Sequence, residues 1–272
     1  VHDMSLLSLP SMIDLRTLQV KSWAYQLQGA SPEAIVTSGF DLVVIDYSRD
    51  GSEEQKYSEE EIQKIKDAGV IPLAYISVGE AENYRFYWEE EWCRGSPEWL
   101  GKENPEWIGN YAVRYWEKGW KENLFLYLDK IIAQGFSGIY LDKVDEFEYW
   151  SDSNNGEGFV LSEEEAAKRM ISFILEIANY CRSKDVDFYI IPQNGERLLG
   201  FDNGLLLATV SSWAAEDLFY NGITPIAPSL TEEKTYYLDM VRLAGKPVFS
   251  VDYVDDGSGH TGANGERIDK YR

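Results

Sequence analysis

The chain is poor in the side chains that several catalytic classes require. Its 272 residues contain only two histidines, His2 and His260, and two cysteines, Cys93 and Cys181, without metal-ligand spacing or a Cys-x-x-Cys pair. We therefore expect unpaired cysteines, no zinc site and no Ser-His-Asp triad. Neither common glycine-rich phosphate-binding pattern follows a candidate strand. The prediction is an activity that uses no metal and no organic cofactor.

Basic residues are also scarce. The 25 Lys and Arg residues face 47 Asp and Glu residues, which gives a net charge of −22. Such a charge repels phosphate backbones and argues against nucleic acid as a partner, whereas a neutral or cationic ligand fits. Most of this charge is expected on a solvated, Glu-rich surface. We identify no apolar run long enough to span a bilayer and no signal peptide at the start of the chain.

What the chain does contain is a repeated alternation of short apolar runs and amphipathic, helix-length segments. This alternation is typical of βα units around a parallel sheet and predicts an α/β fold, for which a chain of this length allows one barrel or two smaller domains. Because no linker or change of composition divides the chain, we expect a single domain over residues 1–272, and the family resemblance described below implies that it is a TIM (β/α)8-type barrel. Helices are expected after Ser58 and Ser162, where Ser-Glu-Glu-Glu runs match capping signals. The predicted strands are Ser22–Leu27, Leu42–Tyr47, Ile71–Ser77, Gly138–Asp142, Phe188–Pro192, Leu206–Ser211 and Pro247–Tyr253.

Two features depart from a regular barrel. No eighth strand follows Tyr253, so the last βα unit is incomplete, residues are missing at the C-terminus, or a segment such as Met4–Leu9 fills the gap. A segment at about 83–120 is rich in aromatic rings and is expected to be an insert. For any single ring of this insert, membership of a small hydrophobic core is the simpler expectation.

The candidate site lies where the strands end. Carboxyl ends of parallel strands meet at one face of such a fold, so residues far apart in sequence converge there. Carboxylates, amides and aromatic rings are suited to sugars, and glycoside hydrolysis needs one carboxyl group as proton donor and another as nucleophile or base. The residues that follow from this reasoning are Asp46, Tyr75, Glu80, Glu82, Arg85, Asp142, Asp145, Gln193, Asn194, Trp213, Glu216, Asp252 and Tyr253.

Structural roles compete with this interpretation for several of these acids. Glu80 and Glu82 could form a cluster with Arg85. Asp145 could be an acid of a first helical turn, which the helix dipole favours, and Glu216 could have the same role after its strand. Asp142 ends a strand with an apolar body, so a purely surface role is the weaker alternative for it.

Three segments resemble a known family. They are Trp23-Ala24-Tyr25-Gln26-Leu27, the run from Tyr75 to Arg85 that reads YISVGEAENYR, and the run from Gly138 to Asp145 that reads GIYLDKVD. They are similar to the endo-α-1,4-polygalactosaminidases of glycoside hydrolase family 114, and the likeness extends from about Ser22 to Tyr253. The resemblance implies a TIM-barrel hydrolase acting on α-1,4-linked galactosamine polymers or a related polysaccharide. It also implies that Asp142 and Glu216 are the catalytic pair.

The chain has Lys143 where the family pattern leads us to expect a small polar residue such as Asn. Because deacetylated galactosamine is cationic, we expect acids of the site to bind its amines or hydroxyls; these acids are Asp46, Glu80, Glu82, Asp145 and Asp252. The partner would be a polysaccharide or oligosaccharide outside the cytoplasm, in an extracellular or periplasmic setting. Two alternatives remain: a carbohydrate-binding barrel without catalysis, and a structural or inhibitor barrel whose mouth the insert blocks.

Overall fold

The computed structural model describes residues 19–271, and its centre is a parallel sheet. Five strands pair in the order β1-β2-β3-β7-β8, each parallel to its neighbour. An isolated parallel bridge between Gln193 and Ala214 joins β8 to a further parallel pair, β9 and β12. The strands therefore follow one another around the sheet in chain order, as in a TIM barrel. Their bounds are β1 Trp23–Gln26, β2 Leu42–Ile45, β3 Ile71–Ser77, β7 Gly138–Asp142, β8 Tyr189–Pro192, β9 Trp213–Glu216 and β12 Val248–Val251.

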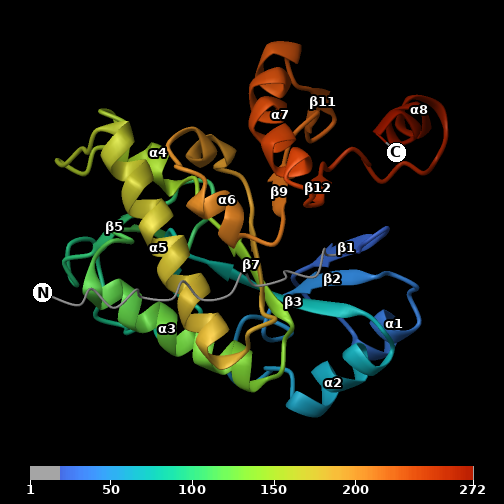
Figure 1. The fold of residues 1–272 in the computed structure, drawn as a ribbon, viewed down its shortest axis with the longest axis horizontal. Coiled ribbons are helices and arrows are strands. Elements are labelled where there is room, and N and C mark those ends of the chain that lie inside the picture. The colour runs from blue at the N-terminus through green and yellow to red at the C-terminus, as the bar shows by residue number, and fades with distance from the viewer. Residues whose placement is uncertain (1–18, 272) are drawn as a thin grey trace, which may run out of the picture.

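Helices connect these strands and cover the outside of the sheet (Figure 1). Helix α2 begins with the capping box that the sequence predicted, because Ser58 and Glu61 each bond the other's backbone N–H. Ser162 caps the 22-residue helix α5 through its side-chain oxygen, which accepts the Glu165 N–H. None of the helices within residues 19–271 is long and apolar enough to cross a membrane. The helices are α1 Pro32–Val36, α2 Glu59–Asp67, α3 Lys118–Ala133, α4 Glu146–Ser151, α5 Glu163–Lys184, α6 Leu205–Thr209, α7 Pro228–Leu243, α8 Gly262–Tyr271 and the 3₁₀ turn Glu196–Gly200.

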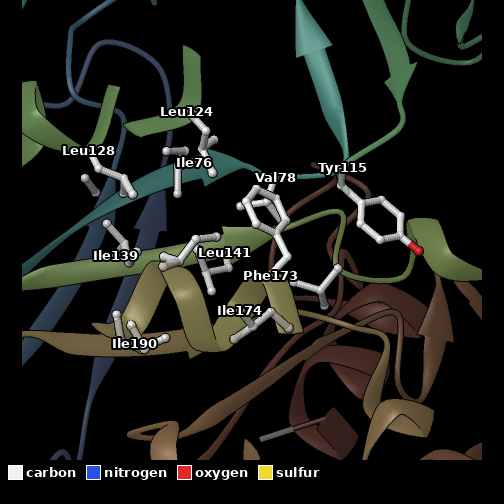
Figure 2. Close-up of a cluster of buried hydrophobic side chains, with 14 of the residues drawn as sticks. Ile76, Val78, Tyr115, Leu124, Leu128, Ile139, Leu141, Phe173, Ile174 and Ile190 are labelled. Atoms are coloured by element: carbon white, nitrogen blue, oxygen red, sulfur yellow. The ribbon is translucent and has the colours of Figure 1, made fainter. Parts of the chain in front are cut away.

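Alternation along the strands separates two apolar clusters. Side chains on the outer face, such as Ile76 and Leu141, pack against α3 and α5 in the larger cluster (Figure 2). Those on the other face fill the inside of the curved sheet, among them Tyr75 and Tyr140. Because side chains of a strand alternate, Asp142 shares the inner face with Tyr140. The strand pattern thus turns the last residue of β7 toward the interior.

The first and last strands meet through their side chains. The Trp23 ring of β1 lies 5.2 Å from the Phe249 ring of β12, and both belong to the inner cluster. No backbone ladder joins β12 to β1 among the described residues, and no eighth parallel strand occurs between residues 19 and 271. The predicted gap-filling segment Met4–Leu9 lies outside the described residues.

The sixth predicted strand, Leu206–Ser211, is wrong. Leu205–Thr209 forms helix α6, and the Asp202 carboxylate accepts the backbone N–H groups of Leu206 and Leu207 at its start. Three successive leucines fit a helix as well as a strand. The true strand, β9, reads Trp-Ala-Ala-Glu, and alanine has a low strand propensity. One consequence is that Glu216 ends a strand and does not begin a helix.

The aromatic segment builds a small antiparallel sheet whose buried rings join the larger apolar cluster. Strands β4 (Glu80–Glu82), β6 (Asn110–Val113) and β5 (Leu100–Glu103) pair in that order. Trp92 packs edge-on against Trp99 at 4.9 Å, and Trp99 lies 5.4 Å from Trp120 of α3. Most rings of this segment therefore stabilise each other. A two-stranded hairpin, β10 (Tyr220–Asn221) and β11 (Thr224–Pro225), follows β9.

Candidate active site

A cleft of about 550 Å³ opens over the carboxyl ends of the strands. The small antiparallel sheet contributes to its wall but does not close it, which argues against a blocked mouth. Nine of the predicted site residues line the cleft, namely Asp46, Tyr75, Glu80, Arg85, Asp142, Asp145, Asn194, Glu216 and Tyr253.

Asp142 ends β7 and is gripped by three hydrogen-bond donors. The Tyr75 hydroxyl donates to Oδ2 at 2.6 Å, and the Gln193 amide and the Lys143 backbone N–H donate to Oδ1 at 3.0 and 2.8 Å. Burial raises the pKa of Asp142 to about 6, and the hydrogen bond from Tyr75 opposes this rise. The carboxyl group is therefore predominantly ionised at pH 7.

Glu216 ends β9 on the same inner face and is half-buried. The Tyr253 hydroxyl donates to Oε1 at 2.5 Å, and the Asn194 side-chain oxygen accepts the Glu216 backbone N–H at 2.8 Å. Burial raises the pKa of Glu216, and the nearby carboxylates of Asp217 and Asp145 raise it further. Glu216 has fewer donors than Asp142, so hydrogen bonding stabilises its ionised form less.

Gln193 connects the two carboxyl groups. Its buried amide nitrogen lies 3.0 Å from Asp142 Oδ1 and 3.4 Å from Glu216 Oε2, while its oxygen accepts the Tyr140 hydroxyl at 2.6 Å. The amide has this orientation because only its NH₂ group can donate to two carboxylates. Since one nitrogen contacts both, Asp142 and Glu216 face each other inside the cleft.

The backbone is strained directly after each of these three residues. Lys143, Asn194 and Asp217 have φ angles of 61°, 59° and 49°, and they are the non-glycine residues with positive φ between residues 19 and 271. A side chain in this left-handed conformation costs about 1–3 kcal/mol, and such strain concentrates at functional sites. No sequence motif predicts this feature, although Lys143 already departs from the expected family pattern.

Arg85 organises one wall of the cleft from a buried position. Its guanidinium pairs with Asp46 at 2.8 Å and with Glu82 at 2.6 Å. The other Glu82 oxygen accepts the Tyr84 hydroxyl at 2.5 Å, so both of its oxygens are engaged and Glu82 does not line the cleft. Burial raises the pKa of Asp46, and the charge of Arg85 opposes this rise. The structural alternative considered for Glu82 is thus the arrangement observed.

Glu80 pairs with Lys143 and not with Arg85. Lys143 Nζ lies 3.0 Å from Glu80 Oε1 and 3.5 Å from Glu146 Oε2. Glu80 also accepts the side-chain amides of Asn104 and Asn110 at 2.8 and 3.3 Å. Its carboxylate therefore ties the loop beside Asp142 to the β5–β6 turn.

Four predicted residues do not line the cleft: Glu82 and Gln193, described above, and also Trp213 and Asp252. Trp213 is fully buried, and its indole N–H donates to the Asn194 carbonyl at 2.9 Å. Asp252 accepts three backbone N–H groups, those of Leu218, Phe219 and Tyr220, at 2.8 to 3.0 Å. Trp213 therefore supports the turn after β8, and Asp252 supports the loop after β9.

Asp145 lines the cleft with unused hydrogen-bonding capacity. Its buried Oδ1 has no hydrogen-bond partner within the described residues, and burial raises the pKa of the group. Sequence reasoning missed several further lining residues, which are Tyr25, Leu27, Gln28, Asp50, Gly51, Tyr84, Trp107, Ile108, Asn110 and Lys143. Most of them lie on loops beyond the strand ends, where no apolar run marks them. Among residues 19–271, no cluster of three His, Cys, Asp or Glu side chains is placed to hold a metal ion.

Solved structures of low sequence identity share this fold. The chain aligns with Aspergillus fumigatus Ega3, solved in complex with galactosamine, at a TM-score of 0.68 and 17% identity, over 93% of this chain and 85% of that one. The glycoside hydrolase domain of PelA from Pseudomonas aeruginosa aligns at a TM-score of 0.66 and 17% identity, over 93% and 88% of the two chains. The fold is accordingly that of TIM-barrel glycoside hydrolases.

Sequence comparison identifies closer relatives. An uncharacterized protein of Methanocaldococcus jannaschii is 57% identical over 92% of this chain and 70% of its own length. An uncharacterized protein of Thermotoga maritima is 54% identical over 87% of this chain and 72% of its own length. The model of glycoside hydrolase family GH114 matches residues 12–271. With a match over nearly its whole length, the chain belongs to glycoside hydrolase family GH114.

Proposed function

We propose that this glycoside hydrolase cleaves a polymer of α-1,4-linked galactosamine or a closely related amino-sugar polysaccharide, with Asp142 and Glu216 as the catalytic pair. The observation that carries the proposal is the Gln193 amide nitrogen, which contacts both carboxyl groups within an open cleft. A non-catalytic sugar-binding protein has no need of two facing carboxyl groups with different hydrogen-bond environments.

The spacing of the pair favours a double displacement. Because Asp142 Oδ1 and Glu216 Oε2 contact the same nitrogen, these oxygens are no farther apart than the sum of the two contacts. That sum is below the range of about 6.5 to 9.5 Å that suits inversion, in which a water must fit between the sugar and the base. We infer from this upper limit that the enzyme retains the anomeric configuration.

In the proposed first step, the Asp142 carboxylate attacks the anomeric carbon while Glu216 transfers its proton to the departing glycosidic oxygen. The products are a glycosyl ester on Asp142 and a free chain end. In the second step, Glu216 as carboxylate takes a proton from water, whose oxygen attacks the anomeric carbon and releases Asp142. Burial raises the pKa of both carboxyl groups, so the assignment rests on hydrogen bonding: three donors favour the ionised form of Asp142 as nucleophile, and Glu216, with fewer donors, is assigned as proton donor.

The charge of the cleft supports a cationic sugar. Asp46 and Glu80 are paired with Arg85 and Lys143, but Asp50, Asp145 and the catalytic pair have no basic partner of their own in the cleft wall. The Asp145 carboxylate lines the cleft and is suited to accept a hydrogen bond from a sugar amine or hydroxyl. We expect the KM for such a polymer to rise with added salt, whereas a neutral polymer would show little change.

The test is a hydrolysis screen of amino-sugar polymers, including deacetylated and acetylated α-1,4-galactosaminan, with chitosan as a linkage control. Wild type should release reducing ends from one of them, and Asp142→Asn should not, while both keep the same melting temperature. Glu122→Gln, which alters an exposed ion pair on α3, is the matched control and should retain full activity. Polymer binding without hydrolysis by wild type would instead establish the non-catalytic barrel.

Because an enzyme encounters a polysaccharide substrate outside the cytoplasm, we propose that this protein acts in an extracellular or periplasmic setting. Fractionation of the native host, followed by detection with an antibody, tests this setting. Detection of the mature chain only in the cytoplasm would refute it.

A further inference from the structure

The turn between β5 and β6 places two apolar side chains on the rim of the cleft. Trp107 and Ile108 are 68% and 78% exposed, yet both line the cleft that contains Asp142. Apolar side chains of this size are exposed at a cost, and next to a polar cleft they are typical of a binding surface.

Trp107 differs from the other tryptophans of the chain. Seven of the nine stack with other rings, and Trp213 is buried with its indole N–H bonded. The Trp107 ring has no ring, cation or hydrogen-bond partner among residues 19–271. The other tryptophans are explained by packing or by an indole hydrogen bond, but Trp107 is not.

The turn that carries Trp107 is held firmly. The Asn110 N–H donates to the Trp107 carbonyl at 3.0 Å, and the Gly109 N–H donates to the Glu103 carboxylate at 2.8 Å. Glu80 accepts the amides of Asn104 and Asn110 on either side of the turn and pairs with Lys143. The position of the turn is thus fixed relative to Asp142, and little backbone entropy is lost if Trp107 binds a ligand.

Tyr84 offers a second fixed ring in the same cleft. It is 48% exposed, and the Arg85 guanidinium lies 4.8 Å from its centroid. A Cβ at Gly51 would lie 2.7 Å from two atoms of this ring, so only glycine fits there. The ring is therefore confined between Arg85 and Gly51 while part of it faces the cleft.

We propose that Trp107, with Tyr84 elsewhere in the same cleft wall, forms an aromatic subsite for a sugar unit of the polymer that lies away from the bond being cleaved. Circular order around the sheet supports the placement: the turn is anchored next to β3, followed by Asp142 on β7, Glu216 on β9 and Tyr253 after β12. The occupant is a further sugar unit of the polysaccharide that is bound in the same cleft, so the subsite rests on the proposed function. It predicts that substrate length affects binding through Trp107.

The experiment measures KM and kcat for deacetylated α-1,4-galactosaminan and for its shortest cleaved oligomer. Trp107→Ala should raise KM for the polymer about tenfold with kcat unchanged, because one ring contact is lost. It should leave both constants unchanged for the shortest oligomer. Trp107→Phe should restore most of the affinity, and Tyr236→Ala, an equally exposed ring on α7 outside the cleft, should have no effect.

The same polymer is also titrated into Asp142→Asn with and without Trp107→Ala, which measures binding without turnover. Weaker binding by the double variant supports the subsite, and equal binding overturns it. Hydrolysis of the polymer with a KM that does not depend on Trp107 overturns the subsite alone. Trp107-dependent binding by a wild type that hydrolyses nothing overturns the proposed function alone. The melting temperature should not change, since the Trp107 side chain is 68% exposed and contacts no other ring among residues 19–271.

Discussion

Residues with a positive φ angle occur at both ends of the barrel strands, but the residue types differ between the two ends. At the amino ends, the chain enters β3, β7 and β12 shortly after Gly69, Gly135 and Gly245, and these glycines take the positive φ angles. At the carboxyl ends of β7, β8 and β9, Lys143, Asn194 and Asp217 take them. Glycine adopts this conformation without cost, whereas other residues are strained. The difference indicates that the amino ends serve stability and the carboxyl ends hold the site at a cost in stability.

The largest expected effect concerns the proton donor at the strained end. Glu216→Gln should lower turnover of the polymer about 10²–10⁴-fold, because an amide cannot protonate the leaving oxygen. An aryl glycoside of the same sugar with an acidic phenol as leaving group needs no such help. On that substrate, Glu216→Gln should therefore release phenol in a rapid burst. A burst slowed as much as polymer turnover would assign Glu216 another role.

A second prediction concerns the residue that joins the pair. Gln193→Met keeps the volume of the side chain but removes the donor shared by Asp142 and Glu216, so kcat should fall about 10–100-fold. Loss of a donor to the ionised form raises the pKa of Asp142, and the acid limb of the pH profile should move to higher pH. A lower kcat with an unshifted limb would show a merely structural role.

The pH dependence of the wild type follows from the nucleophile. Asp142 must be ionised, and burial raises its pKa to about 6. Activity should therefore be lost as the pH falls through about 6, with kcat/KM decreasing about tenfold per pH unit below it. A steady-state profile between pH 4 and 8 measures this, and constant activity down to pH 4 would exclude an Asp142 with a raised pKa.

The smallest effects test the strain itself. Asp217→Gly should raise the free energy of unfolding by about 1 kcal/mol, because it relieves the left-handed strain at the carboxyl end. Gly69→Ala should lower it by about 1 kcal/mol without changing activity, since open space surrounds that position and only its φ of +82° is unfavourable. Urea denaturation of both variants measures these changes in the free energy of unfolding. Destabilisation by Asp217→Gly would contradict the contrast between the two strand ends.

Periodicity and strand-end logic predicted much of the fold and of the site. Apolar runs identified β2, β3, β7 and β8, and the fixed polarity of parallel strands placed Asp142 at the cleft. Glu216 was selected because it follows a predicted strand that is in fact helix α6, and because of the family resemblance. Strand β9 was missed because Ala-Ala carries no strand signal. The positions of Trp213 and Asp252 were also beyond such reasoning, since composition does not reveal whether a side chain faces the cleft or supports a loop.

The central claim is that Asp142 and Glu216 act on one linkage at a separation that suits double displacement. Proton NMR of the first sugar ends released from an α-linked substrate tests it most directly, before the two anomers interconvert in solution. Initial release of the α-anomer is the predicted result. Initial release of the β-anomer would contradict the proposed geometry, because inversion requires a water between the base and the sugar.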